Sequence, residues 1–201
     1  RGPDSTGYAL FGPEREQIVM RYKLADANDA RDFDYADRLE TNRREVEGRL
    51  HSLGAVVEEI DVETDYAFRV TMRYTGDVKA LADYIEDVPN CEVLSLGHSL
   101  EIIKDLGDAD TVCNQYHLGG FSGTHAIGHV RMATESDVDI SGAHPYWAYP
   151  FSDIAVVHNG QLTNYFYWKR RLERSGHRFQ SGCASRIIAV DRADRQAEGL
   201  A

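Results

Sequence analysis

Two short segments in the C-terminal half contain residue types that can act on an amino acid. Arg131 ends a short apolar run, and its planar guanidinium can bind a carboxylate through two hydrogen bonds. Asn159-Gly160 follows the alternating stretch 153–157, so a side-chain amide and a backbone N–H lie together at a tight turn. Two fixed donors of this kind suit the oxyanion of a tetrahedral intermediate. Together these groups describe a site that hydrolyses the side chain of an amino acid.

Each of these features also has an ordinary structural interpretation. Asn-Gly is a common hairpin turn, and an arginine that follows a strand is usually a surface charge. His144-Pro145 forms a restricted corner between the two segments. His129 and His158 flank the strands, and we interpret them as structural histidines rather than ligands. The spacing alone leaves both interpretations open.

Several motifs, taken in their order along the chain, resemble a known family. They are Arg1-Gly2-Pro3-Asp4-Ser5-Thr6-Gly7, GHVRMATES at 128–136, AHPY at 143–146 and AVVHNGQLTNY at 155–165. This set is similar to the class II glutamine amidotransferase domain of the N-terminal-nucleophile hydrolases. The subgroup that it resembles is the glutamate-synthase-like amidotransferase subunits, including those of N-methylglutamate synthase. The motifs cover residues 1–12 and 119–201, and no motif covers the middle of the chain.

The resemblance implies a role for each matching residue. Asn159 and Gly160 would hold the oxyanion, and Arg131 would bind the α-carboxylate of L-glutamine. The positions implied in substrate binding are Arg131, Thr134, His144, Asp4, Ser5 and Ala184, with His144 shaping the loop. The nucleophile of the family is an N-terminal cysteine, whose own α-amine serves as the base. No cofactor and no metal are expected.

Two departures from the family pattern bear on activity. Where the family has an aspartate that binds the substrate ammonium, this chain has Ala184, and Arg186 reverses a charge two residues later. None of the three cysteines lies at a terminus, so we expect the nucleophile and a first strand and helix to be missing from these 201 residues. The chain as it stands is therefore expected to be inactive.

Two functions of different classes follow from these observations. The first is a glutamine-hydrolysing subunit that supplies ammonia to a synthase partner subunit. The alternative is a degenerate, non-catalytic module that keeps the fold and binds a partner subunit.

Composition narrows the classes of partner and compartment. The formal net charge of −11 disfavours nucleic acid, and no stretch approaches the roughly 20 apolar residues of a membrane span. The three cysteines are widely spaced without a CxxC pair, which argues against a disulfide framework and a zinc site. A cytoplasmic protein with no membrane partner is the simplest interpretation.

The elements that must position these residues indicate the α/β (α+β) class. The resemblance implies a four-layer αββα sandwich of the N-terminal-nucleophile hydrolase type over residues 1–201, and the strand-rich middle predicts an α/β insertion over 24–118. Strands are predicted at 8–11, 17–22, 56–60, 66–74, 91–96, 126–131 and 153–158. Helices are predicted at 26–52, 77–87, 100–106, 108–116 and 164–175.

Overall fold

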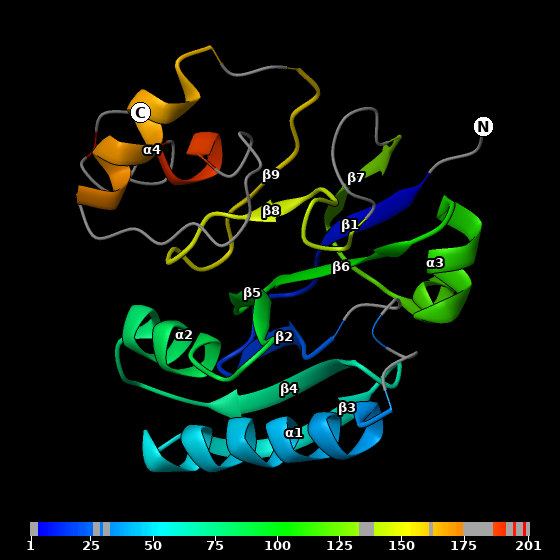
Figure 1. The fold of residues 1–201 in the computed structure, drawn as a ribbon, viewed down its shortest axis with the longest axis vertical. Helices are drawn as coiled ribbons and strands as arrows, with labels where there is room; N and C mark the ends of the chain where they lie inside the picture. The colour runs from blue at the N-terminus through cyan, green and yellow to red at the C-terminus, as the bar shows by residue number, and fades with distance from the viewer. Residues whose placement is uncertain are drawn as a thin grey trace.

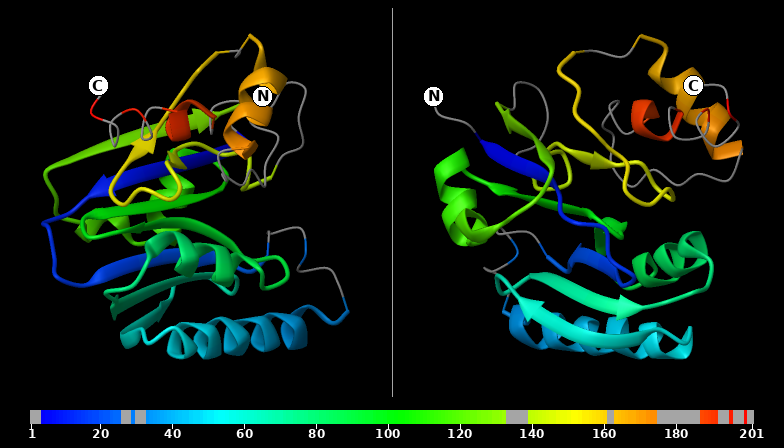
Figure 2. Two further views of the ribbon diagram at one scale, coloured as in Figure 1. Left: turned by 90° about the vertical axis from the view of Figure 1, so that its left-hand side faces the viewer. Right: turned by 180° about the vertical axis from the view of Figure 1, so that it is seen from behind.

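The computed structural model describes residues 4–25, 29, 33–132, 139–160, 163–174, 187–191, 195 and 199. These residues form a mixed α/β fold in which all of the described strand pairs are antiparallel (Figure 1). The expected α+β class is therefore confirmed. Helix α1 lies at one end of the molecule and α4 at the other, with the sheets between them (Figures 1 and 2).

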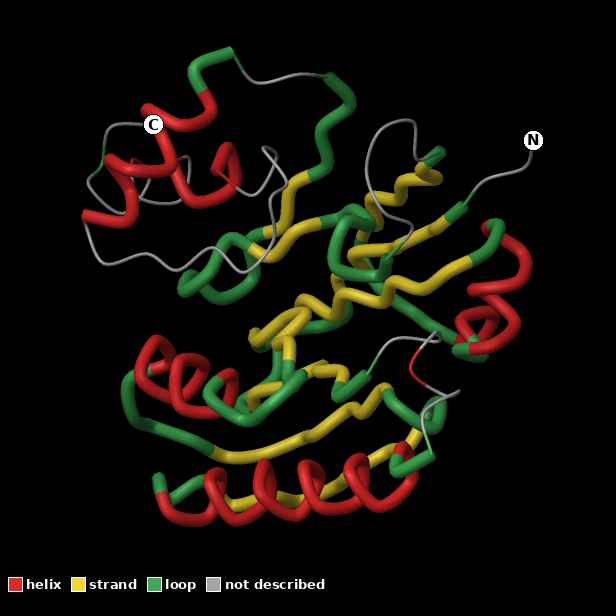
Figure 3. Tube along the Cα trace, viewed as in Figure 1, coloured by secondary structure: helices red, strands yellow, loops and turns green. Residues whose placement is uncertain are grey.

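Strands follow one another in groups of two or three between the helices along the chain, and Figure 3 shows where the helices, strands and loops lie. The strands are β1 Ser5–Phe11, β2 Ile18–Lys23, β3 Val56–Val62, β4 Ala67–Arg73, β5 Glu92–Gly97, β6 Leu100–Leu106, β7 His125–Arg131, β8 Tyr146–Trp147 and β9 Ala155–Val156. The helices are α1 Tyr35–Ser52, α2 Val78–Glu86, α3 Ala109–Gln115, the short 3-10 turn η2 Leu118–Gly120 and α4 Tyr165–Arg174.

The described strands form a four-stranded, a three-stranded and a two-stranded sheet. The four-stranded sheet has the order β3-β4-β2-β5. Its elements follow the chain as β2-α1-β3-β4-α2-β5, which is the split βαβ arrangement of ferredoxin-like folds. The three-stranded sheet has the order β6-β1-β7, and β8 pairs with β9. The chain thus passes from the three-stranded sheet into the four-stranded one after β1, and returns after β5.

Local sequence explains most of these elements. The carboxylate of Asp77 accepts the backbone N–H of Lys79 at 2.7 Å and of Ala80 at 3.3 Å, so the predicted N-cap of α2 is confirmed. Helix α1 turns Val46 and Leu50 into the core. The helix begins at Tyr35, whereas the prediction placed its start at residue 26, and Phe33 before it is exposed.

The prediction of a helix at 100–106 is wrong, because this segment is the strand β6. Glu101, Lys104 and Asp105 interrupt the apolar pattern, so the sequence resembles an amphipathic helix. All three side chains are nevertheless buried. A strand can bury them because each finds a partner of opposite charge or a hydrogen-bond donor on a neighbouring element.

The prediction of a strand over 153–158 is correct only for Ala155–Val156, which is β9. Asp153 has φ of +61°, a left-handed conformation that no strand continues. β9 also pairs with β8 rather than with β7, so the two predicted site strands lie in different sheets.

The predicted insertion over 24–118 combines elements of both large sheets. β3, β4 and β5 lie with β2 in the four-stranded sheet, whereas β6 pairs with β1 along its whole length. The boundaries of the insertion stay a prediction. The register shows that β6 is a structural neighbour of the N-terminal motif.

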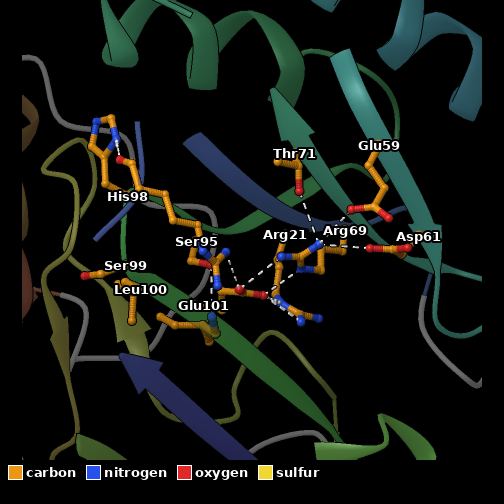
Figure 4. A network of polar contacts seen from close by, with 12 residues as sticks. Arg21, Glu59, Asp61, Arg69, Thr71, Ser95, His98, Ser99, Leu100 and Glu101 are labelled. Atoms are coloured by element: carbon orange, nitrogen blue, oxygen red, sulfur yellow. Dashed lines mark hydrogen bonds and ion pairs between the residues drawn. The ribbon is translucent and has the colours of Figure 1, made fainter. Parts of the chain in front are cut away.

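A buried group of charges joins the two large sheets (Figure 4). Glu101 on β6 receives Arg21 Nε from β2 and Arg69 Nε from β4, each at 2.9 Å. Arg15 Nη1 donates to the other carboxylate oxygen at 3.1 Å. Burial by itself raises the pKa of Glu101, but the hydrogen bond from Arg69 and the charges of Arg21 and Arg69 lower it to about 2. This carboxylate is therefore ionised throughout the physiological range.

Candidate functional site

The register of β1 with its two neighbours gathers polar residues on one face of the three-stranded sheet. Ser5 on β1 lies opposite Arg131 on β7, and Gly7 lies opposite both His129 and Lys104. Directly opposed residues of antiparallel strands share a face, and so do alternate residues of one strand. The structure thus brings Ser5 and Arg131, two of the predicted site residues, onto the same face.

The loop around His144 covers this face, which we call the site face and define by Ser5, Lys104, His129 and Arg131. A side chain at Gly7 would run into the backbone carbonyl of His144. The His144 ring lies 4.6 Å from that of His129 between centroids. Lys104 Nζ lies 3.5 Å from the carbonyl oxygen of Ala143. His144 is buried, and its role in shaping the loop stays a prediction.

Gly7 is the residue on which this close approach depends. We expect Gly7→Ala to lower the free energy of unfolding by about 1–3 kcal/mol, because the added methyl must displace the His144 carbonyl. Gly128→Ala on the adjacent strand is the control, since its added carbon would meet only ordinary van der Waals contacts, the nearest with Tyr8 at 3.5 Å and with the Gly7 carbonyl at 3.6 Å. Urea unfolding of both variants makes the comparison. Equal losses would show that the His144 loop does not rest on β1.

The site face keeps its histidines neutral at physiological pH. Burial, followed by the positive charges of His129, Lys104, Arg131 and His158, lowers the pKa of His144 to about 4. Burial and the charge of Arg131 also lower the pKa of His129. With both imidazoles neutral, Arg131 supplies the positive charge that can bind a carboxylate.

Two buried polar atoms on the site face have no hydrogen-bond partner among the described residues. Ser5 Oγ and His129 Nδ1 are buried and form no hydrogen bond with any residue that the structure describes. Buried polar atoms are normally paired with protein, water or ligand. The interpretation of His129 as an ordinary structural histidine does not explain why its Nδ1 atom has no hydrogen-bond partner among the described residues.

The remaining predicted residues lie around the same loop or outside the described part of the chain. The Asp4 backbone N–H donates to the Arg131 carbonyl at 2.9 Å, so Asp4 adjoins the site face. Asn159 and Gly160 are exposed just beyond β9. His158 before them acts electrostatically on His144, as Arg131 does. Convergence of Asn159 with Arg131 on one cavity stays a prediction. Thr134, Ala184 and Arg186 lie outside the described residues.

Sequence reasoning missed Lys104 and Gly7 as neighbours of the site. Lys104 fell in the segment that was expected to be helical, whereas the strand register sets it beside Gly7. Its ammonium group forms an ion pair with Glu92 at 3.3 Å, so the site face is tied to the end of β5. Gly7 belongs to the N-terminal motif. Because glycine has no side chain, it leaves room for the backbone of the His144 loop.

Two further observations concern metals and membranes. Among the described residues, no group of His, Cys, Asp or Glu is arranged to hold a metal ion. None of the helices built from those residues has the length and apolar character to span a bilayer.

The chain is similar to known proteins that are named as glutamine amidotransferases. The chain is 34% identical to a protein of Methanothermobacter thermautotrophicus named as a glutamine amidotransferase, over 99% of this chain and 64% of the relative. It is 31% identical to the glutamine amidotransferase-like protein GlxB of Rhizobium meliloti, over 99% of this chain and 61% of the relative. The chain therefore spans less than two thirds of the length of these relatives.

A partial similarity extends to a larger enzyme. The chain is 39% identical over 89 residues to the glutamine–fructose-6-phosphate aminotransferase of Methanothermobacter thermautotrophicus, which is 44% of this chain and 15% of that enzyme. No protein-family model matches the chain. The relatives named here support the glutamine amidotransferase class that the motifs resemble.

Proposed function

We propose that this chain is a class II glutamine amidotransferase domain of the N-terminal-nucleophile hydrolase type. It hydrolyses L-glutamine to L-glutamate and ammonia, and a glutamate-synthase-like partner subunit consumes the ammonia in the cytoplasm. The observation that carries the proposal is the site face itself. Ser5 and Arg131 lie opposite one another beneath the His144 loop, in a chain that is similar over nearly its whole length to proteins with glutamine amidotransferase in their names.

The proposed reaction assigns a task to each group. Arg131 binds the α-carboxylate of glutamine, and the neutral imidazoles beside it add no positive charge of their own. A cysteine thiolate attacks the side-chain amide carbon, and the Asn159 amide with the Gly160 N–H holds the resulting oxyanion. The amide nitrogen takes up a proton and leaves as ammonia, forming a thioester. Water hydrolyses the thioester to glutamate and restores the thiol.

The alternative function is a non-catalytic module of the same fold that binds a partner subunit. The sequence at 183–186 favours it, because Ala184 cannot pair with a substrate ammonium and Arg186 reverses a charge. Loss of one partner of a buried charged contact costs about 2–5 kcal/mol. At about 1.4 kcal/mol per factor of ten, glutamine binding would weaken by more than tenfold.

Glutamate release from glutamine, measured in three proteins, tests the proposal. The first is the polypeptide of residues 1–201, which begins with Arg1 and should release no glutamate. The second carries an N-terminal extension that begins with cysteine, and it should be active with a raised KM. The third adds Ala184→Asp and Arg186→Glu, and its KM should fall at least tenfold.

The outcomes separate the two functions. Activity in the first protein would contradict the assigned nucleophile. Equal KM values in the second and third would show that Ala184 lies outside the substrate site. Inactivity of all three, with each one folded by circular dichroism, would favour the non-catalytic module.

A further inference from the structure

The turn between β5 and β6, at 97–100, is where several distant segments meet. It joins the four-stranded sheet to the three-stranded sheet. The Ser99 carbonyl accepts the Gly12 N–H at 2.9 Å, and the His98 carbonyl accepts the Arg15 N–H at 3.2 Å. Glu101, which the three arginines surround, follows the turn directly. The turn is therefore held firmly from the side of both sheets.

Asp153 attaches a third segment to this turn. Its carboxylate accepts the backbone N–H groups of His98 at 3.0 Å, Ser99 at 2.7 Å and Leu100 at 2.7 Å. The Ser99 hydroxyl donates to the same carboxylate at 3.1 Å. Hydrogen bonds to an ionised acceptor are about twice as strong as neutral ones. Partial burial raises the pKa of Asp153, but the N–H groups of Ser99, Leu100 and His98 together lower it, so the carboxylate is charged at neutral pH.

The fit between Asp153 and the turn depends on two unusual backbone features. A side chain at Gly97 would collide with the Asp153 carboxylate, so only glycine admits it. Asp153 itself has φ of +61°, a conformation that aspartate and asparagine adopt more readily than most residues. Gly97 thus leaves the space that the Asp153 carboxylate occupies, and Asp153 adopts the backbone conformation that brings its side chain there.

The segment that follows Asp153 is also held by a hydrogen bond from the Ala148 N–H to the Ile154 carbonyl at 2.9 Å and by the packing of Ile154, Ala155 and Val156 against apolar residues. β9 begins two residues later and pairs with β8 only through Tyr146 with Val156 and Trp147 with Ala155. A two-stranded ladder is at best marginally stable alone. The ladder is anchored at one end by the buried Trp147. Asp153 lies at the same end of the ladder, because Trp147 pairs with Ala155, and Asn159 follows Asp153 by six residues.

We propose that Asp153 is a positioning residue that fixes Asn159 and Gly160 by tethering their segment to the β5–β6 turn. The inference rests on the proposed function, in which these two residues hold the oxyanion. Asp153 acts through the backbone that it fixes and does not touch the substrate.

Amide hydrogen exchange in the full-length protein tests the tether without any need for activity. We compare Asp153→Asn and Asp153→Ala with the unsubstituted protein. Asparagine tolerates the same backbone conformation and keeps one of the two acceptor oxygens, so Asp153→Asn removes the charge and one acceptor but leaves part of the contact in place. Exchange across 154–160 should quicken by about tenfold in the alanine variant and by less in the asparagine variant, while β1 keeps its protection. Unchanged exchange at 157–160 in Asp153→Ala overturns the proposal.

Steady-state kinetics of the cysteine-initiated protein test the effect on the reaction. An oxyanion donor acts mainly in the transition state, so its displacement should lower kcat by about tenfold and leave KM within about twofold. The active-site concentration, titrated with a covalent glutamine analogue, should be unchanged. If the rate falls only in proportion to the concentration of titrated active sites, the variant has lost folded protein in general. That result overturns the proposal.

Ser99→Ala is the matched control, because it removes the hydroxyl contact and keeps all three backbone donors. It should change neither exchange nor kcat by more than about twofold. If the unsubstituted enzyme releases no glutamate, the proposed function fails, and the catalytic half of the inference fails with it. The hydrogen-exchange experiment then still tests whether Asp153 holds residues 154–160 against the β5–β6 turn.

Discussion

Glu101→Gln should lower the free energy of unfolding by about 3–5 kcal/mol, the cost of breaking a buried ion pair from one side. Glutamine fits the same space but leaves Arg15, Arg21 and Arg69 without the negative charge on which they converge. The loss should appear as a lower midpoint of urea unfolding at pH 7, with an unchanged slope.

Glu58→Gln is the matched control for Glu101→Gln. Glu58 is exposed, and its ion pair with Arg73 at 2.6 Å lies at the surface, where such pairs contribute about 0–1 kcal/mol. A loss at Glu101 no larger than the loss at Glu58 would contradict the view that this network holds the two sheets together.

The same carboxylate makes stability depend on pH in a defined window. The pKa of Glu101 is lowered to about 2 in the folded protein, against about 4.3 in an unfolded chain. Its contribution is therefore complete above about pH 4.3 and is lost as the pH falls towards 2. The arginines around it stay charged in this range. Unfolding free energies between pH 5 and pH 2.5 should fall more steeply for the unsubstituted protein than for Glu101→Gln, and parallel curves would contradict the assignment.

Asn159→Ala should lower kcat for glutamine hydrolysis by about 10²–10³ in the cysteine-initiated protein, with little change in KM. In the proposed reaction the Asn159 amide meets full negative charge only in the tetrahedral intermediate. Arg131→Met should instead raise KM strongly, since a carboxylate is charged in the ground state as well. The opposite pattern would contradict both assignments.

Asn114→Ala is the control for Asn159→Ala. Asn114 is an exposed asparagine on α3. Tyr8 on the face opposite the site face donates its hydroxyl to Ala109 at the start of that helix, at 2.8 Å. Replacement of Asn114 by alanine should leave kcat and KM unchanged. A similar fall in kcat in both variants would remove the evidence for an oxyanion role of Asn159.

Sequence reasoning succeeds here where local patterns decide the structure. Strands β3 and β4 and the capped helix α2 follow from alternation and from Asp77, so their prediction needs no knowledge of distant contacts. The resemblance assigns both Ser5 and Arg131 to the substrate site, and the register places them opposite one another, while their roles stay predictions.

The failures come from interactions between residues far apart in the chain. β6 was predicted as a helix because Glu101 and Lys104 look like surface charges, and only their partners on β2, β4 and β5 make burial favourable. The stretch at 153–158 was predicted as a strand because its alternation is clear. The left-handed conformation of Asp153 depends on donors at 98–100, which no local pattern reveals.

The contact between Gly12 and Ser99 has an evolutionary consequence. The chain leaves the three-stranded sheet just before Gly12 and returns to it just after Ser99, and a hydrogen bond of 2.9 Å joins the two crossings. Segments whose ends lie side by side can be gained or lost without rethreading the rest of a fold. Residues 13–98 therefore have the geometry of an exchangeable unit, because a short loop in their place would leave β1 and β6 paired.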